Sequence, residues 1–498
     1  TDAELIYARG FPPEATYQFK HALIRDTAYD ALLKSRRREL HRLVAETIDK
    51  TFAALREQPE VLAHHWTEAG ETEFALTQWS KAGKAAQARN AFSEARESYQ
   101  LALTQLSLLP ESPERDAREL QLMLSLISML FVTRGWAAPE MVAVAERAAM
   151  LAEKGGNLRQ LIGSILRRGS QALFAGELGK GGALADQALE LARREGSSTM
   201  LAYAHNLQLV TRYYRGDLAG VEKHFAAGLQ FFDDPMFRAT EIAIGVFAHA
   251  ANCAWLAGRV NVARDRITSA AAAVNPTNHY QRSFADQVAA ALHTSLGENE
   301  EAEIVAARAL ELSEKHQIPS VAASSRCLLG HAWAQLGRPA DGIELIRRGI
   351  TEAQPVVLGL LTTRLAAAQQ RAGALDDALE MAEKALEVTP EVLVYRPETL
   401  RVRGELRLAK GQTDLAEADF RDSINLAKSM GAKAYELRTA MSWARLLASK
   451  GRADEARAML AEIYNWFTEG FDTPDLKEAK ALLEEGGLRR RFIEAMRR

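Results

Sequence analysis

The chain has 498 residues, of which 47% are hydrophobic and 26% are charged. This composition is typical of a soluble globular protein that can bury a large core. The formal net charge of -3 gives no overall attraction to nucleic acid or to anionic membranes. We find neither a signal peptide nor an apolar run of about twenty residues, so the sequence predicts no membrane span.

The first segment, residues 1–56, precedes a repeated pattern. Apolar residues recur at helical spacing from Tyr17 onward, which predicts an amphipathic helical segment whose apolar face needs a partner surface. The chain opens with Thr1 instead of Met, so we expect a fragment or a processed product.

A pattern that occurs ten times fills residues 57–463. A turn residue, usually glycine, is followed five positions later by a small residue, then usually by a bulky one and another small one. From Trp136 onward, successive turn residues are between 36 and 42 positions apart. Such a period predicts a solenoid of helical hairpins. The predicted turn residues are Asn90, Trp136, Gly176, Gly216, Gly258, Gly297, Gly337, Gly373, Gly411 and Gly451.

The hairpin beginning at Gly411 illustrates the physical basis of the pattern. Ala416, Phe420 and Ser423 follow the turn, and small residues at such positions let two helices approach closely. Glycine at the turn supplies a helix C-cap. Another small residue recurs seven positions before most turns, although Leu209 and Met129 break the rule. These small residues are Gly83, Gly169, Ala251, Ala290, Gly330, Ala366, Gly404 and Ala444.

These offsets resemble the tetratricopeptide consensus, although a period near 40 exceeds the usual 34. We therefore predict an all-α, tetratricopeptide-like superhelix of about ten helical hairpins, with a small N-terminal helical remnant. In such an array each unit contacts only its neighbours, and the core grows along one axis. An ordinary alanine-rich helical protein is the alternative, and the regular glycines argue against it.

The end of the chain departs from the repeat. Residues 464–485 are predicted to form a capping helix, and residues 486–498 are a Gly-Gly pair followed by a basic amphipathic tail. Such a tail suits a partner groove or anionic lipid, but it is marginal as an isolated helix. A lineage-specific or artificial extension is the alternative.

The residues with potential for chemistry indicate no enzyme. Cys253 and Cys327 are nearly two repeats apart, so we expect no disulfide or thiolate metal site and favour a reducing, cytoplasmic location. The stretch 176–182 imitates a phosphate-binding loop but lacks the hydroxyl residue for magnesium. His64 and His65 point about 100° apart on one helix, which disfavours a metal site. We predict no catalytic residue, no cofactor and no metal.

The inner groove is the predicted working surface. In tetratricopeptide arrays the first helix of each unit lines the concave side, and residues ten, six and three positions before a turn face it. A mixture of amides and aromatic rings there suits a peptide or a small polar ligand, while a merely solvated groove is an equal alternative. The candidate binding residues are Asn206, Tyr213, Asn252, Trp255, Gln287, His331 and Arg401.

Two further groups on the first helices carry weaker expectations. Three histidines on different repeats are expected to be exposed in the groove, namely His205, His249 and His331. Five arginines near the C-terminal end could attract an acidic partner, namely Arg401, Arg403, Arg407, Arg438 and Arg445.

Several segments resemble a known protein family. The family is that of bacterial STAND-type ATPases fused to class III adenylate or guanylate cyclases, and the similarity runs over roughly residues 4–485. The segments are 12–17 (Pro-Pro-Glu-Ala-Thr-Tyr) and 19–23 (Phe-Lys-His-Ala-Leu), which are similar to the end of the winged helix, 134–140 (Arg-Gly-Trp-Ala-Ala-Pro-Glu) and the closing 464–480.

This resemblance implies that residues 1–56 are a winged-helix remnant and that the chain is a regulatory part of a larger signal-transduction enzyme. Such an array is thought to be a sensor or an inhibitory surface for upstream ATPase and cyclase domains. The family's catalytic residues have no counterpart here, because cyclase and phosphate-loop motifs are missing. The alternatives are an oligomerisation module of the parent enzyme and a hydrolase with a site in the groove.

Overall fold

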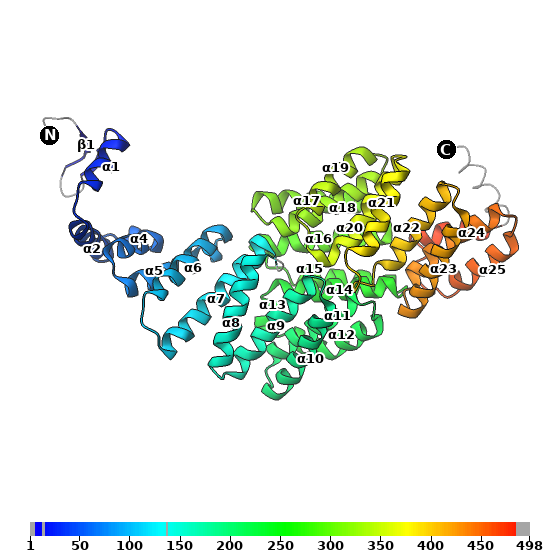
Figure 1. Ribbon diagram of the computed structural model, residues 1–498, viewed down its shortest axis with the longest axis horizontal. Coiled ribbons are helices and arrows are strands. Elements are labelled where there is room, and N and C mark those ends of the chain that lie inside the picture. The colour runs from blue at the N-terminus through cyan, green and yellow to red at the C-terminus, as the bar shows by residue number, and fades with distance from the viewer. Residues whose placement is uncertain (1–4, 12–14, 136–137, 485–498) are drawn as a thin grey trace. The chain divides into compact units, whose positions relative to one another are not determined.

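The computed structural model describes residues 5–11, 15–135 and 138–484 (Figure 1). The chain divides into two compact units, Thr1–Met129 and Leu130–Arg498, which we describe separately. The predicted turn residue Trp136 and the tail at 486–498 lie outside the described residues. Within the described part, no helix is both long and apolar enough to cross a bilayer.

The first unit begins with two short antiparallel strands, in which Ile6 pairs with Phe19. The amphipathic helix predicted from Tyr17 onward begins only at Ala22, because Thr16–Phe19 forms a strand, as β-branched and aromatic residues favour. Apolar residues of the following segment are exposed, as Leu23 (80%) and Leu33 (76%) show. The elements are β1 (Ile6–Arg9), β2 (Thr16–Phe19), α1 (Ala22–Asp30), α2 (Lys34–Thr51), α3 (Ala53–Arg56), α4 (Pro59–Ala69), α5 (Thr72–Ala88) and α6 (Phe92–Ser107).

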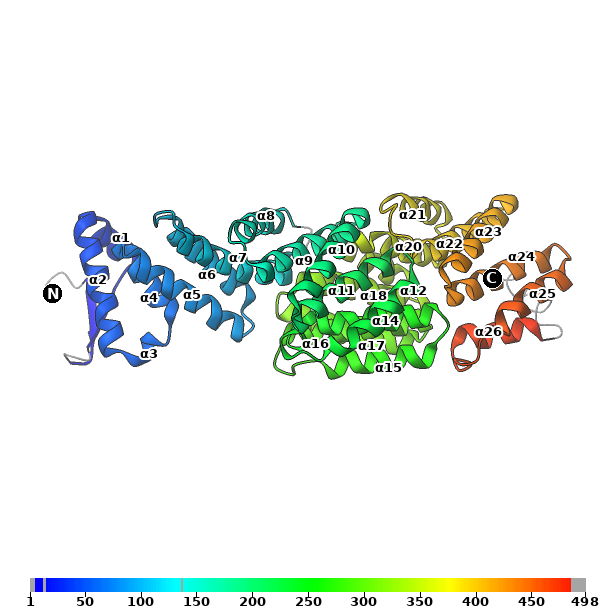
Figure 2. The ribbon, with the colours of Figure 1, turned by 90° about the horizontal axis from the view of Figure 1, so that it is seen from below.

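Helix α7 (Pro113–Arg134) crosses the boundary between the units, and the second unit continues as paired helices (Figure 2). Its helices are α8 (Pro139–Lys154), α9 (Leu158–Phe174), α10 (Leu178–Glu195), α11 (Ser198–Tyr214), α12 (Leu218–Phe232), α13 (Pro235–Arg238), α14 (Glu241–Leu256), α15 (Val260–Ala272), α16 (His279–Leu296), α17 (Asn299–Lys315), α18 (Pro319–Gln335), α19 (Pro339–Ile350), α20 (Pro355–Arg371), α21 (Leu375–Glu387), α22 (Arg396–Ala409), α23 (Thr413–Met430), α24 (Lys433–Ser449), α25 (Ala453–Tyr464) and α26 (Pro474–Leu483).

Nine of the ten predicted hairpins lie within the described residues, namely α5/α6 and the pairs from α9/α10 to α24/α25, and the turn of the tenth lies outside them. All nine turn residues that the structure describes have a positive φ. The lowest value is +63° at Asn90 and the highest is +91° at Gly337. This left-handed conformation ends the first helix of each hairpin and favours glycine. The predicted all-α, tetratricopeptide-like superhelix is therefore confirmed.

The small residues lie where two helices of a hairpin cross. A Cβ atom on Gly83 would lie 2.6 Å from a ring carbon of Tyr99, and one on Gly404 would lie equally close to the ring of Phe420. The alanines of the pattern are fully buried, as Ala251, Ala290, Ala366, Ala444 and Ala416 show. Bulky rings on the second helix thus fill the space that small residues on the first helix leave.

The expectation that each hairpin contacts only its neighbours was wrong for the second unit. The Arg438 guanidinium on α24 donates a hydrogen bond to the Ser295 carbonyl on α16 (2.7 Å). The Leu393 amide donates to the Tyr214 carbonyl at the end of α11 (2.9 Å). One buried apolar cluster accordingly contains residues from Ile162 to Tyr435. The superhelix of this unit coils tightly enough for its late hairpins to pack against its early ones.

Candidate functional site

The first helices of the second unit surround a cavity of about 280 Å³. Its lining residues come chiefly from α11, α14, α16, α18, α20, α22 and α24, together with the loop before α22. This volume is near the lower end of the roughly 300–1,000 Å³ that is usual for small-molecule sites. The coiling of the superhelix has therefore partly enclosed the expected open groove, and we call this space the central cavity.

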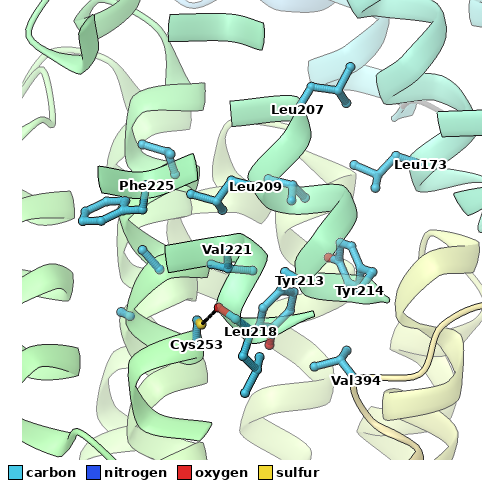
Figure 3. Close-up of a cluster of buried hydrophobic side chains, with 14 of the residues drawn as sticks. Leu173, Leu207, Leu209, Tyr213, Tyr214, Leu218, Val221, Phe225, Cys253 and Val394 are labelled. Carbon is cyan, nitrogen blue, oxygen red and sulfur yellow. Dashed lines mark hydrogen bonds between the residues drawn. The ribbon is translucent and has the colours of Figure 1, made fainter. Parts of the chain in front are cut away.

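Aromatic rings form one part of the cavity wall. Tyr213 contacts Tyr214 with ring centres 5.3 Å apart and Tyr395 with ring centres 6.4 Å apart. Figure 3 shows Tyr213 and Tyr214 at the end of α11, close to Val394 of the loop before α22. Trp255 meets Tyr435 edge to face, with ring centres 5.5 Å apart. Burial raises the pKa of Tyr213 and of Tyr214 well above the ordinary value, so both rings stay neutral.

A half-buried arginine without a counter-ion, Arg364 on α20, also lines the cavity. Among the residues that the structure describes, no side chain forms an ion pair or hydrogen bond with its guanidinium. The groups that act on it electrostatically are Cys327 and the three tyrosines Tyr395, Tyr435 and Tyr213. Burial lowers the pKa of Arg364, yet an arginine side chain remains charged in proteins. A half-buried cation that faces a cavity without a carboxylate partner favours an anion there.

Other polar atoms of the wall also lack partners within the described residues. They are Nδ1 of His331, Oγ of Ser320 and Oε1 of Gln354. Burial, followed by the charges of Arg364, Arg371 and Arg438, lowers the pKa of His331 to about 3. His331 is therefore neutral at physiological pH. A polar ligand would satisfy atoms that the fold leaves without hydrogen bonds.

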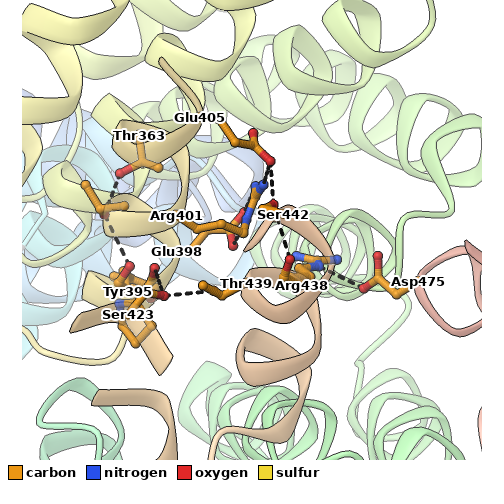
Figure 4. Close-up of polar contacts among 12 residues, drawn as sticks. Thr363, Tyr395, Glu398, Arg401, Glu405, Ser423, Arg438, Thr439, Ser442 and Asp475 are labelled. Carbon is orange, nitrogen blue, oxygen red and sulfur yellow. Dashed lines mark hydrogen bonds and ion pairs between the residues drawn. The ribbon is translucent and has the colours of Figure 1, made fainter. Parts of the chain in front are cut away.

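Two further lining residues, Glu398 and Arg438, belong to a network of paired ions (Figure 4). Arg401 bonds to Glu398 (2.6 Å) and to Glu405 (2.6 Å), while Arg438 bonds to Asp475 (2.7 Å). Burial would raise the pKa of Glu398, but Arg401 and further cations outweigh it and lower this pKa to about 2. This network is internally satisfied, which distinguishes it from Arg364.

Five of the seven candidate residues predicted from the sequence line the central cavity, namely Tyr213, Asn252, Trp255, Gln287 and His331. Asn206 does not line it. Arg401 does not line it either, and its charge is paired as described above. The rule that residues ten, six and three positions before a turn face the groove did not select Arg364, because Arg364 lies nine positions before Gly373. The rule also missed Tyr435, because the start of α24 reaches the cavity only through the coiling of the superhelix.

The sequence suggested that five arginines near the C-terminal end attract an acidic partner. Each of these arginines already has a carboxylate partner within the chain, so the structure does not support that hypothesis. Arg403 and Arg407 both bind Asp419, at 2.6 and 2.9 Å. Arg445 binds Glu478 at 2.6 Å, and the other two belong to the network described above. The expected exposure of His205 was also wrong, because it is 4% exposed and its Nδ1 lies 3.3 Å from Nδ1 of His224.

The remaining motifs of the sequence are structural. In the stretch 176–182, which is similar to a phosphate-binding loop, the Gly179 amide donates a hydrogen bond to the Glu391 carboxylate (2.6 Å). A side chain of the protein itself therefore occupies the position that a phosphate would take. Cys253 and Cys327 lie within α14 and α18, inside helices as predicted, and both are buried. A wider surface hollow of about 680 Å³ lies over α21 to α23, but its charged Arg403 is already paired.

Comparisons with known proteins leave the family open. No family model matches the sequence. The uncharacterized protein R02095 of Rhizobium meliloti (strain 1021) is 30% identical over 144 residues, which are 29% of this chain and 14% of that protein's length. The matched part of the chain thus spans about a seventh of this relative.

Two solved structures are similar in fold. The Rap protein complexed with Competence and Sporulation Factor has a TM-score of 0.46 at 11% identity, covering 68% of this chain and 98% of that one. Yeast Tom70 has a TM-score of 0.36 at 13% identity, covering 84% of this chain and 99% of that one. Because both TM-scores are below 0.5, neither similarity supports a conclusion about the central cavity.

Proposed function

We propose that the second unit is a non-catalytic ligand-sensing module whose central cavity holds a small anion, such as a carboxylate with a flat apolar part. The observation that carries the proposal is the unpaired Arg364 guanidinium in the cavity wall. A planar guanidinium binds a carboxylate or phosphate through two parallel hydrogen bonds.

The aromatic wall supports the second part of this ligand description. Tyr213, Tyr395 and Trp255 offer apolar ring surface within the same cavity, which suits a flat or hydrocarbon group. Neutral Asn252 and Gln287 offer amides for further hydrogen bonds. The small volume favours a metabolite-sized ligand over a folded protein segment.

We propose further that occupancy of the cavity is transmitted to catalytic domains of the same polypeptide. This step rests on the resemblance to STAND-type ATPases fused to cyclases, in which such an array is a regulatory part. The ligand would bind late and early hairpins together, since the wall contains Tyr213 of α11 and Tyr435 of α24. A ligand that bridges them stabilises the closed superhelix, which is a global state that a neighbouring domain can sense. The reading frame upstream of Thr1 would then encode an ATPase and a cyclase.

The alternatives have no specific observation in their favour. For a hydrolase we would look for a hydroxyl or thiol bonded to a histidine in the cavity. Among the described lining residues, the Nδ1 atom of His331 has no partner, and that of His249 lies 2.7 Å from the Gly245 carbonyl oxygen. For an oligomerisation module, the exposed Leu23 and Leu33 of the first unit offer an apolar surface, but a second copy of the chain is only one of the partners that could cover it.

The test is binding of defined anions to the purified full chain. A panel of 4-hydroxybenzoate, benzoate, succinate and inorganic phosphate would be titrated with tryptophan fluorescence and calorimetry as readouts. We expect an aromatic carboxylate to bind with a change in Trp255 emission, which Trp255→Phe removes without abolishing the heat of binding. The variant Arg364→Gln is expected to weaken binding by about tenfold or more, since a charge-assisted pair contributes about 1.5–3 kcal/mol.

The matched control is Arg308→Gln, which removes an arginine whose side chain is 59% exposed and paired with Asp286. It is expected to bind as the natural chain does. Equal affinity in Arg364→Gln and Arg308→Gln would contradict the proposed role of Arg364. Absence of binding across the whole panel would contradict the anion-sensing function.

A further inference from the structure

Three histidines of the first unit lie close together, although His41 is distant in sequence from His64 and His65. His41 lies on α2, and His64 and His65 lie on α4. One ring nitrogen from each lies within 4.8 Å of the others. The sequence argument against a metal site considered only α4 and therefore did not include the nitrogen that α2 contributes.

We propose that His41, His64 and His65 bind one divalent late transition metal, with zinc as the reference ion. Imidazole nitrogens suit Zn²⁺, Ni²⁺, Co²⁺ and Cu²⁺, and three protein ligands leave a fourth position for water.

The spacing of the rings fits such an ion. Three imidazoles bound to one tetrahedral zinc at about 2.0–2.1 Å per nitrogen have ring centres roughly 5 Å apart. Here the ring centres lie 5.0 Å (His41 to His65), 5.4 Å (His64 to His65) and 5.7 Å (His41 to His64) apart. The ring centres are therefore spaced as they would be around one ion, and rotation of the exposed His64 ring can bring its nitrogen closer to the other two.

The proton positions are also compatible with metal binding. Nδ1 of His41 and Nδ1 of His65 lie 2.8 Å apart, so without metal one of them must carry the shared proton. On metal binding, both Nδ1 atoms offer lone pairs, and the proton of His41 moves to Nε2. There it can be donated to the Tyr29 hydroxyl oxygen, which lies 3.0 Å away. In a metal-binding histidine, the ring nitrogen that does not bind the metal usually donates a hydrogen bond to a neighbouring group, and this bond fixes the orientation of the ring.

The surroundings favour a cation. The rings of His41 and His65 are half-buried between α2 and α4. Neutral imidazole is the form that binds metals. The Glu68 carboxylate, one turn further along α4, acts on both rings with a negative charge that attracts a cation.

A metal at this position would join α2 to α4 and, through Tyr29, would fix α1 beside them. The apolar contacts between these helices are few, because the local cluster consists of Ala45, Ile48, Leu62, Trp66 and their neighbours. The ion would therefore act as a clamp on the N-terminal helices of the first unit.

The test uses the full chain, freed of metal with a chelator and titrated with zinc chloride against a chromophoric competitor. We expect one zinc ion per chain at this site and a higher melting temperature with zinc. His41→Gln and His65→Gln are each expected to weaken binding by about 100-fold or more. Tyr29→Phe is expected to weaken zinc binding by about tenfold, because the hydrogen bond that orients the His41 ring is lost.

The matched control is His316→Gln, because His316 belongs to a different ring pair, stacked on His279 at 3.7 Å. This variant removes the same kind of side chain and is expected to bind zinc as the natural chain does. Circular dichroism of each variant checks that its helices are intact. Stoichiometry below one ion per chain at saturation would overturn the proposal, as would unchanged affinity in His41→Gln and His65→Gln.

Discussion

Gly404 on α22 lies directly against the ring of Phe420 on α23, so that a Cβ atom at position 404 would come within 2.6 Å of a ring carbon. Both residues belong to the pattern that recurs from hairpin to hairpin. Phe420 is 0% exposed, so the ring has no free space into which it can move. The contact therefore explains why a helix interior tolerates glycine at this position.

The variant Gly404→Ala is expected to lower the melting temperature. Overpacking a tight crossing costs about 1–3 kcal/mol, which exceeds the gain of about 1 kcal/mol in helix propensity. The control is Gly163→Ala in α9, where the nearest atom to a new Cβ is the flexible Arg167 guanidinium at 3.5 Å. That variant is expected to be neutral or stabilising. Equal melting temperatures for the two variants would refute the crossing geometry.

Arg364→Met is expected to stabilise the ligand-free chain. The methionine side chain is similar in length but carries no half-buried unpaired charge, and replacing a group kept for function commonly gains on the order of 1 kcal/mol. Scanning calorimetry without added anions should show a rise of about 2 °C. Arg308→Met, at an exposed paired position, should leave the transition unchanged. A marked fall for Arg364→Met would show that Arg364 supports the fold instead of serving a ligand.

Glu398 should make the second unit sensitive to acid. Its folded pKa of about 2 is below the ordinary 4.5, so the unfolded chain binds more protons between these values. Stability is therefore complete above pH 4.5 and is lost as the pH falls toward 2. At about 1.4 kcal/mol for each pKa unit, the loss is roughly 3 kcal/mol.

The measurement is chemical denaturation from pH 2.5 to 7 of the natural chain and of Glu398→Gln. The variant should be less stable at pH 7, because Arg401 loses a partner, and its stability should depend less on pH below 4.5. Glu455→Gln, at an exposed pair with Arg452, is the control and should keep the natural acid dependence. A pH profile of Glu398→Gln parallel to that of the natural chain would contradict this prediction.

Cys253 and Cys327 should resist thiol reagents in the folded chain. Burial raises the pKa of both thiols, for Cys327 to about 12, and only the thiolate reacts. A chromogenic disulfide reagent at pH 8 should label neither residue at a rate within roughly a thousandfold of a free thiol. In denaturant it should label two thiols per chain, which are all that the sequence contains. Rapid labelling of the folded chain would show that these helices open.

The sequence predicted the hairpins well because their determinants are local. A glycine such as Gly373 marks a left-handed turn, and a small residue such as Ala416 marks a crossing, whatever the distant parts of the chain do. The N-terminal strands escaped prediction because each has only four residues, too few for a period of two to stand out.

The candidate site was predictable only in part, because it depends on the coiling of the array. Tyr213 and Trp255 were found on the inner face, but they are 5% and 6% exposed and belong to the packed core. Their replacement by alanine would therefore destabilise the fold as well as affect a ligand. Arg364 and His41 were missed because their significance comes from residues far away in sequence, which no offset along one helix reveals.

The hydrogen bond from Arg438 to the Ser295 carbonyl limits how this array can change its length. An open array can gain or lose a hairpin anywhere, since the remaining hairpins keep their own neighbours. Here an extra hairpin between α16 and α24 would rotate α24 away from its acceptor. Duplication or deletion of repeats is thus tolerable outside the closed part of the second unit but not within it.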